Sequence, residues 1–156
     1  MDHRKFIEMA IEKAQESVNL GGFPAGAVVV QNGIIVGEGI SLGNKLHDPA
    51  SHGELSAIRD ACKNLTTSVL SDCTLYASME PCIMCLSASM WSSIPKIIFA
   101  CSKQHVSHEY YGGQYQSTEI NSLFSHPLDI IHFRELEESS LSVVKNWENF
   151  GKGSII

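Results

Sequence analysis

The chain has 156 residues and a net charge of −6, with 44% hydrophobic and 18% charged residues. These values are typical of one globular domain, here predicted to span residues 1–156, and they exclude a largely disordered chain. No apolar run approaches the roughly 20 residues that a membrane-spanning helix needs. The amphipathic start of the chain also differs from a secretion signal. We therefore expect a cytoplasmic protein with no membrane partner.

The acidic charge favours a small-molecule substrate over a polynucleotide. Proteins that bind the nucleic-acid backbone usually carry a basic cluster, and the only such pair here is Arg4-Lys5. Of the five cysteines, Cys62, Cys73 and Cys101 lie outside any metal motif. Because no secretion signal precedes them, we interpret these three as buried packing residues and not as disulfide partners.

The first part of the chain is predicted to form a helix and a β-hairpin. Residues 2–19 carry apolar side chains at helical spacing with charges between them, which indicates an amphipathic helix. The β-branched runs 25–31 and 34–40 are joined by Asn32-Gly33, a strong hairpin signal. Residues 41–50 contain glycine, asparagine, aspartate and proline, and we expect a loop there.

The remainder alternates between strands and helices. A polar stretch with three tyrosines, residues 102–127, is expected to form a loop with short helical pieces over the site. A hairpin followed by this alternation predicts an α/β fold with a mixed five-stranded sheet and helices on both faces. The predicted elements are a helix after residue 52, a strand at 74–78, a helix from residue 81 that ends near 93–95, strands at 96–101 and 128–133, and a helix at 135–150.

The sequence His52-Gly53-Glu54 is predicted to lie at the start of a helix. Ser51 and Glu54 have the spacing of a capping box, and apolar residues follow at helical period. This places an imidazole and a carboxylate together at one helix N-terminus.

A second cluster is Pro81-Cys82-Ile83-Met84-Cys85. Proline is favoured at the first helical position, so both thiols are predicted to lie in the opening turn of a helix. The partial positive charge at that end of a helix favours the thiolate that a metal ion requires.

Together the two clusters predict a zinc site held by His52, Cys82 and Cys85. Three protein ligands leave the fourth tetrahedral position open for water, as in catalytic zinc sites. Zinc lowers the pKa of bound water to about 7, and Glu54 is placed to act as the proton shuttle. A C-x-x-C pair is also compatible with a redox role or with half of a structural zinc site, and Glu54 with a simple cap. The combination of H-x-E with P-C-x-x-C matches the signature of zinc deaminases.

On these residues the chain resembles the cytidine deaminase-like superfamily, and within it small guanine and cytosine deaminases and tRNA adenosine deaminases. The resemblance implies a three-layer α/β/α sandwich, a homodimer or higher homo-oligomer, and hydrolytic release of ammonia from a heteroaromatic ring. It also implies zinc on His52, Cys82 and Cys85, proton transfer by Glu54, and a substrate amine held near the backbone of residues 80–82.

Different parts of the sequence resemble deaminases with different substrates. Gly53 and the run Gly21-Gly22-Phe23-Pro24 look like fungal cytosine deaminases, whereas Asp48-Pro49 and the segment 57–63 look more like guanine deaminases. Guanine is therefore the first expected substrate and cytosine the second. Trp147 and Phe150 resemble the segment that closes over the base in both groups, although a packing role is equally open. The residues expected to contact substrate are Phe23, Ser41, Glu80, Trp91, Trp147 and Phe150.

Two positions depart from the relatives. The asparagine that they use to bind the base falls on Ser41, with Asn44 three residues away. The acidic residue of guanine deaminases falls on Gly112 or Gly113, with Glu109 nearby. Such changes can alter specificity strongly, since a buried hydrogen-bonding site rejects a poorly matched ligand.

Two other functions remain open at the level of sequence. One is deamination of a tRNA wobble adenosine, which the acidic run Glu135-Leu136-Glu137-Glu138 disfavours. The other is a structural zinc scaffold, which predicts a fourth protein ligand from His47 or Cys73. Two further predictions concern contact surfaces. Tyr110, Tyr111 and Tyr115 are expected to form a lid or an oligomer contact, and Met90 with Trp91 is expected at a subunit interface.

Overall fold

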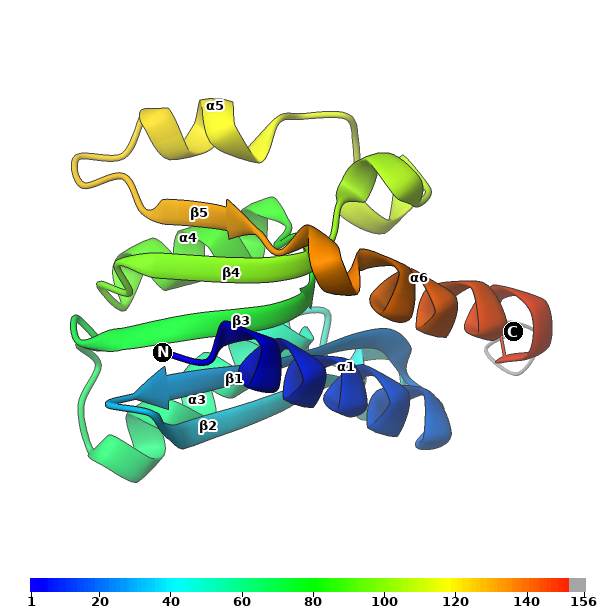
Figure 1. Cartoon of the computed structure of the whole chain (residues 1–156), viewed down its shortest axis with the longest axis horizontal. Helices are drawn as coiled ribbons and strands as arrows, with labels where there is room; N and C mark the ends of the chain where they lie inside the picture. Colours follow the sequence, from blue (N-terminus) through cyan, green and yellow to red (C-terminus); the bar gives the residue numbers. More distant parts are fainter. Residues whose placement is uncertain (152–156) are drawn as a thin grey trace.

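The computed structural model describes residues 1–151, so residues 152–156 of the predicted domain lie outside the described part. A five-stranded sheet in the order β2-β1-β3-β4-β5 forms the middle of the molecule (Figure 1). The strands are β1 (Phe23–Gln31), β2 (Ile34–Ser41), β3 (Cys73–Met79), β4 (Lys96–Cys101) and β5 (Asp129–His132).

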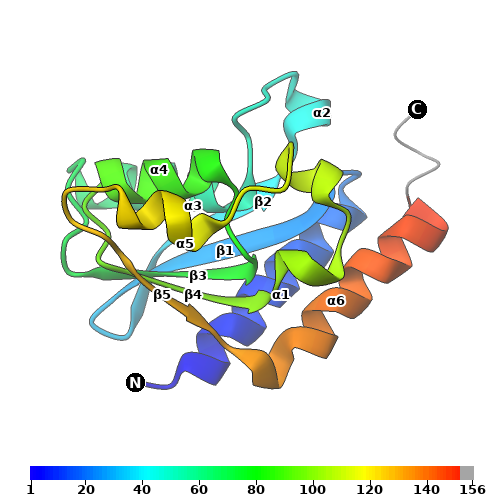
Figure 2. The same ribbon diagram turned by 90° about the horizontal axis from the view of Figure 1, so that it is seen from above.

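Helices cover the sheet on both sides, so the predicted three-layer α/β/α fold is confirmed. Figure 2 shows α3, α4 and α5 on one face and α1 and α6 on the other. The helices are α1 (His3–Asn19), α2 (Gly43–Leu46), α3 (Gly53–Leu65), α4 (Ile83–Trp91), α5 (Ser117–Ser122) and α6 (Glu137–Asn146). Short 3-10 turns lie at η1 (Lys103–His105), η2 (His108–Tyr111) and η3 (Arg134–Leu136), and a π-helical turn, η4 (Trp147–Gly151), ends the described chain.

Strand directions bring the important loops to one edge of the sheet. β1 is antiparallel to both β2 and β3, while β3, β4 and β5 are mutually parallel. β2 therefore points the same way as β3, and the carboxyl ends of β2, β3 and β4 lie at the same edge. Ligands of α/β sheets bind at such edges, and the chain leads from β2 to His52 and from β3 to Cys82 there.

Along the central strands, successive core side chains alternate between the two faces of the sheet. Val28 and Tyr76 belong to the cluster that includes Phe6 and Ile7 of α1, whereas Val29 and Leu75 belong to the cluster that includes Ala57 of α3. Successive strand residues point to opposite faces, so central strands covered by helices on both sides read as continuous apolar runs.

Two glycines of β2 allow α3 to approach closely. A Cβ atom at Gly39 would lie 2.1 Å from the backbone oxygen of Gly53, and one at Gly37 would lie 2.4 Å from that of Ala57. Any larger residue at these positions pushes the first turns of α3 away from the sheet. These glycines therefore set the position of the helix that follows His52.

The hairpin and most element boundaries agree with the sequence, with two differences. Asn32 and Gly33 have φ values of 51° and 77°, as a two-residue hairpin turn of type I′ requires. The stretch predicted as a loop at 41–50 contains the short helix α2. A helix of four residues is too short to show a helical period in the sequence. The single helix predicted at 135–150 is divided into η3, α6 and η4.

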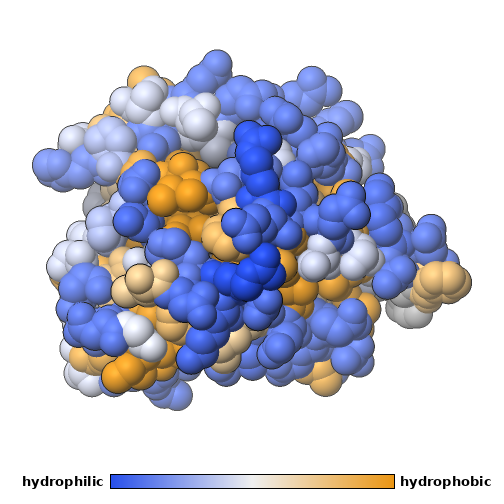
Figure 3. Space-filling view, in the orientation of Figure 1, coloured by the Kyte–Doolittle hydropathy of each residue, from blue (hydrophilic) through white to orange (hydrophobic). Residues whose placement is uncertain are grey.

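Hydrophilic side chains dominate the face seen in Figure 3, and a hydrophobic area lies over β4 and β5, where α1 and α6 do not cover the sheet fully. Among residues 1–151, no helix combines the length and apolar character required to span a membrane.

Candidate metal centre and active site

Two helices begin beside each other at the edge of the sheet. His52 is the N-cap of α3 and Cys82 is the N-cap of α4. Their carbonyl oxygens accept the first helical hydrogen bonds, from the N–H groups of Ser56 at 2.9 Å and Leu86 at 2.8 Å. Both predicted helix starts are therefore present.

The details of these helix starts differ from the prediction. Ser51 does not cap α3, because His52 occupies the N-cap and makes no side-chain cap bond. The predicted capping box is therefore wrong, and Glu54 lies at the second helical position with its side chain buried. Pro81 precedes the N-cap of α4 and is not the first helical residue.

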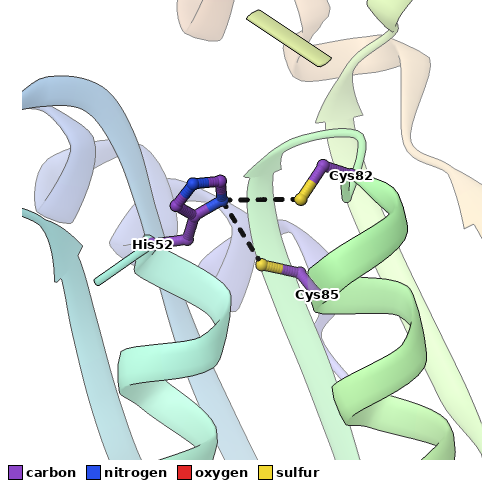
Figure 4. A group of neighbouring side chains, drawn as sticks. All are labelled: His52, Cys82 and Cys85. Carbon is purple, nitrogen blue, oxygen red and sulfur yellow. Dashed lines mark hydrogen bonds between the residues drawn. The ribbon is translucent and has the colours of Figure 1, made fainter. Parts of the chain in front are cut away.

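The side chains of His52, Cys82 and Cys85 converge (Figure 4). The Nδ1 atom of His52 lies 3.4 Å from Sγ of Cys82 and 3.7 Å from Sγ of Cys85. All three ligand atoms lie within 4.8 Å of one another. Zinc bonds of about 2.1 Å to nitrogen and 2.3 Å to sulfur, at a tetrahedral angle, would separate the two atoms by about 3.6 Å. The donor set and its spacing therefore fit zinc.

The electrostatics of this group favour a thiolate. A hydrogen bond from Cys85 and the proximity of His52 outweigh burial and lower the pKa of Cys82 to about 4. The pKa of Cys85 rises in turn, because of its bond to Cys82 and its own burial. The same contact with Cys82 raises the pKa of His52. One negative charge is thus already stabilised where a cation would bind.

The structural-scaffold hypothesis required a fourth protein ligand, and the described residues do not supply one. Within residues 1–151 the only group of three or more candidate ligands is His52, Cys82 and Cys85. The thiol of Cys73 instead lies 3.7 Å from the carboxylate of Asp72. His47 faces the neighbouring cavity but does not belong to the metal group.

Glu54 lies beside the metal group with only 4% of its surface exposed. Burial raises the pKa of its carboxyl to about 7, and the charge of Cys82 contributes to that rise. A group with a pKa near the working pH exchanges protons readily in both directions. Its position and ionisation therefore suit proton transfer.

A cavity of about 710 Å³ opens next to this group. This volume lies in the range of small-molecule sites. Three of the residues predicted to contact substrate, Phe23, Ser41 and Glu80, line the cavity. The other lining residues are Gly22, Ala25, Gly43, Asn44, His47, Asp48, Pro49, His52, Glu54, Met79, Cys82, Tyr110 and Tyr111.

The other three predicted contacts do not line the cavity. Trp91, at the far end of α4 from Cys82, is 80% exposed, and Phe150 is 85% exposed. Trp147 is buried behind the cavity wall, where its ring packs edge-to-face against Phe23 with centroids 5.2 Å apart. Direct substrate contact by these three residues is thus not supported by their positions in this chain.

The structure also shows where the residues lie whose roles the sequence left open. Asn44 of α2 lines the cavity, and so does Ser41, onto which the asparagine of the relatives falls. Neither Gly112, Gly113 nor Glu109 lines the cavity, and Tyr110 and Tyr111 take that place. The sequence signal for the tyrosines is a group of aromatic residues in a polar loop, which predicts either a lid or an oligomer contact.

Comparisons with known proteins identify the family of the chain. Residues 1–101 match the family described as the cytidine and deoxycytidylate deaminase zinc-binding region. Guanine deaminase of Bacillus subtilis is 35% identical over 151 residues, which cover 96% of each chain. A tRNA-specific adenosine deaminase of Aquifex aeolicus is 39% identical over 106 residues, covering 67% of this chain and 70% of that protein.

A solved structure of guanine deaminase from Nitrosomonas europaea shares the fold. It superposes with a TM-score of 0.80 at 20% identity, over 92% of this chain and 83% of the other.

Proposed function

Because the chain belongs to the zinc-binding cytidine and deoxycytidylate deaminase family of hydrolytic enzymes, we propose that it deaminates a free nucleobase, with guanine as the first candidate and cytosine as the second. The observation that carries this proposal is the extent of the match to the guanine deaminase. That match spans 96% of the chain and so includes the segment after residue 101, which supplies Tyr110 to the cavity wall and Trp147 behind it.

His52, Cys82 and Cys85 would hold the zinc ion. When bound, zinc supplies Lewis acidity and lowers the pKa of a coordinated water. The family match and the 3.4 Å and 3.7 Å donor spacings support this assignment. The remaining coordination position would face the cavity, since Cys82 and His52 both line it.

Glu54 would move the protons. In the proposed reaction, the water oxygen bonds to the ring carbon that carries the amino group, the carbon–nitrogen bond breaks, and ammonia leaves. The Glu54 carboxylate accepts a proton from water and delivers it to the ring nitrogen, and then transfers the second proton to the departing amine. Its pKa of about 7 suits both roles.

The cavity wall offers groups for recognising a flat base. Phe23 and Tyr110 supply ring surface, and the Asn44 amide supplies both a donor and an acceptor for the polar edge of a heterocycle. In the relatives an asparagine binds the base, but the matching residue in this chain is Ser41, which has no amide. We therefore assign binding of the base to Asn44. An Asn44→Ala variant should bind a purine more weakly while keeping its zinc.

Deamination of a tRNA adenosine is the second candidate, and the 39% identity to the Aquifex aeolicus enzyme favours it. Two observations weigh against it. The chain carries a net charge of −6, which opposes binding to phosphates. In addition, that match extends over only 67% of the chain.

The deciding experiment is ammonia release by the zinc-loaded protein with guanine, cytosine, adenine, their nucleosides and a tRNA with adenosine at the wobble position. Release from guanine supports the proposal, and release from cytosine selects the second base. Activity on tRNA alone would overturn it. A Glu54→Gln protein run in parallel shows that any ammonia comes from this site.

A further inference from the structure

Glu80 connects the end of β3 to a long segment on the other side of the cavity. Its backbone N–H donates to the carbonyl of Cys101 at 2.8 Å, and its carbonyl accepts from the Tyr111 hydroxyl at 2.8 Å. Both backbone polar groups are therefore used within the protein.

The carboxylate of Glu80 binds both ends of that segment, residues 102–117, which we call the Glu80 loop. One oxygen accepts from the Lys103 N–H at 3.0 Å and the Ser102 hydroxyl at 3.4 Å. The other oxygen accepts from the Ser117 hydroxyl at 3.1 Å. A single carboxylate thus closes the loop by holding its first and last residues.

The Glu80 loop carries aromatic side chains into the site. Tyr110 and Tyr111 line the cavity. The hydroxyl of Tyr115 accepts the N–H of Ile83 at 2.8 Å, at the first helical residue of α4, directly after Cys82. The loop therefore forms one wall of the cavity and also contacts the helix start that holds the two thiols.

A buried cation lies inside the same loop. The Lys103 ammonium lies 4.3 Å from the ring centroid of Tyr115 and 5.7 Å from that of Tyr111. It has no hydrogen-bond partner among residues 1–151, so the faces of the two rings provide its polar contact.

We propose that Glu80 is a positioning residue of the deaminase, which fixes the Glu80 loop so that Tyr110 and Tyr111 form the substrate wall. This differs from the direct substrate contact predicted from the sequence, because the carboxylate acts here through the loop whose donors bind both of its oxygens. The kinetic part of the test rests on the proposed function, whereas the structural part does not.

Glu80→Gln removes the negative charge and replaces one acceptor oxygen by an NH₂ group that cannot accept the Lys103 N–H, so the charge-assisted hydrogen bonds to the loop become weaker ones. We expect KM for the base to rise by about tenfold or more while kcat changes far less, because Glu54 and the metal ligands are untouched. Zinc content should stay at the wild-type level. An unchanged KM would overturn the proposal.

Ser117→Ala gives a milder version of the same change, and it serves if Glu80→Gln fails to fold. It removes the donor at one end of the loop and leaves the other end attached to Glu80. We expect a smaller rise in KM, and a double variant whose rise is less than the product of the two single effects, since both changes act on the same carboxylate anchor. Fully additive effects would contradict the shared anchor.

Glu137→Gln is the matched control. Glu137 also accepts the backbone N–H of Ser102, at 3.0 Å, but from α6 and away from the cavity. Its ion pairs go to His105 and His132, so it holds the start of the loop and does not bridge its two ends. A merely structural role for Glu80 predicts the same KM in both variants, whereas positioning predicts a rise in Glu80→Gln alone.

Hydrogen–deuterium exchange of the zinc-loaded proteins provides a readout that needs no substrate. Peptides covering residues 102–117 and Ile83 should exchange faster in Glu80→Gln than in wild type, with α1 unchanged. If wild type deaminates no base, the proposed function fails, and this exchange pattern still decides the role of Glu80. Equal exchange in the loop would overturn it.

Discussion

The rings of Phe23 and Trp147 meet edge-to-face, with centroids 5.2 Å apart and an interplanar angle of 70°. Phe23 begins β1 and lines the cavity, whereas Trp147 begins the π-helical turn after α6. Tyr110 completes the cluster at 5.2 Å from Phe23 and 5.9 Å from Trp147. The C-terminal part of the chain thus supports a cavity wall formed near its N-terminus.

Trp147→Ala should weaken both the fold and the cavity. Removing a buried aromatic ring typically costs about 3–5 kcal/mol of unfolding free energy, and Phe23 and Tyr110 lose their common neighbour. We expect a lower denaturant midpoint in far-UV circular dichroism and a higher KM. Trp147→Phe keeps an aromatic ring, so its denaturant midpoint and KM should lie between those of wild type and Trp147→Ala. A wild-type KM in Trp147→Ala would show that the cluster does not affect substrate binding.

Glu54→Gln should abolish most turnover while leaving the metal bound. The amide keeps the volume of the buried side chain but cannot accept a proton, and general acid–base groups typically contribute about 10²–10⁴-fold. Zinc content by elemental analysis should equal wild type. Glu12→Gln on the exposed face of α1 is the control, and normal activity in Glu54→Gln would refute the proton-transfer role.

Cys82→Ser and Cys85→Ser should each lower the zinc content and the activity together. A hydroxyl replaces the thiolate that zinc prefers, and the low pKa of Cys82 is lost with its sulfur. Cys73→Ser removes a buried thiol outside the metal group and should keep its zinc. Chelator treatment of wild type should remove activity, and added zinc should restore it.

Gly39→Ala should displace the start of α3. The new methyl group would lie 2.1 Å from the Gly53 carbonyl oxygen and 2.3 Å from the Ala57 nitrogen, which are rigid backbone atoms. We expect a destabilisation of about 1–3 kcal/mol, typical of overpacking, together with weaker zinc binding. Glu38→Ala, at the exposed neighbouring position of β2, tests whether any change on this strand has the same effect.

Glu137 should make stability depend on pH in the acidic range. Partial burial tends to raise the pKa of its carboxyl, but the Ser102 N–H bond and the nearby His132 and His105 outweigh it, so the pKa is lowered. A lowered folded-state pKa adds stability above the unfolded pKa of about 4.3, and this contribution is lost as pH falls through the folded value.

The stability difference between wild type and Glu137→Gln should therefore be present at pH 7 and shrink as pH falls from about 5 toward 3. Urea unfolding at a series of pH values measures it. Glu12→Gln should show no such trend, and a difference that grows on acidification would contradict the assigned sign.

Much of the fold was predictable because its signals are local. Asn32-Gly33 specifies its own turn, and the continuous apolar runs in 25–31 and 96–101 mark strands buried on both faces. The helix α2 and the division of the last helix were not predictable, because segments such as α2 and η3 are too short to show a clear periodicity. In the same way, the capping box was misassigned because Ser51 and His52 are both adjacent to the helix start.

The sequence by itself determined the candidate metal ligands and proton shuttle, because His52, Glu54, Cys82 and Cys85 stand in two short motifs whose residue types and spacing are local features. Only the tertiary structure decided which side chains form the cavity. Asn44 of α2 and Tyr110 of η2 line it, whereas Trp91 at the end of α4 is exposed. Those positions depend on packing between segments far apart in the chain, which no local pattern encodes.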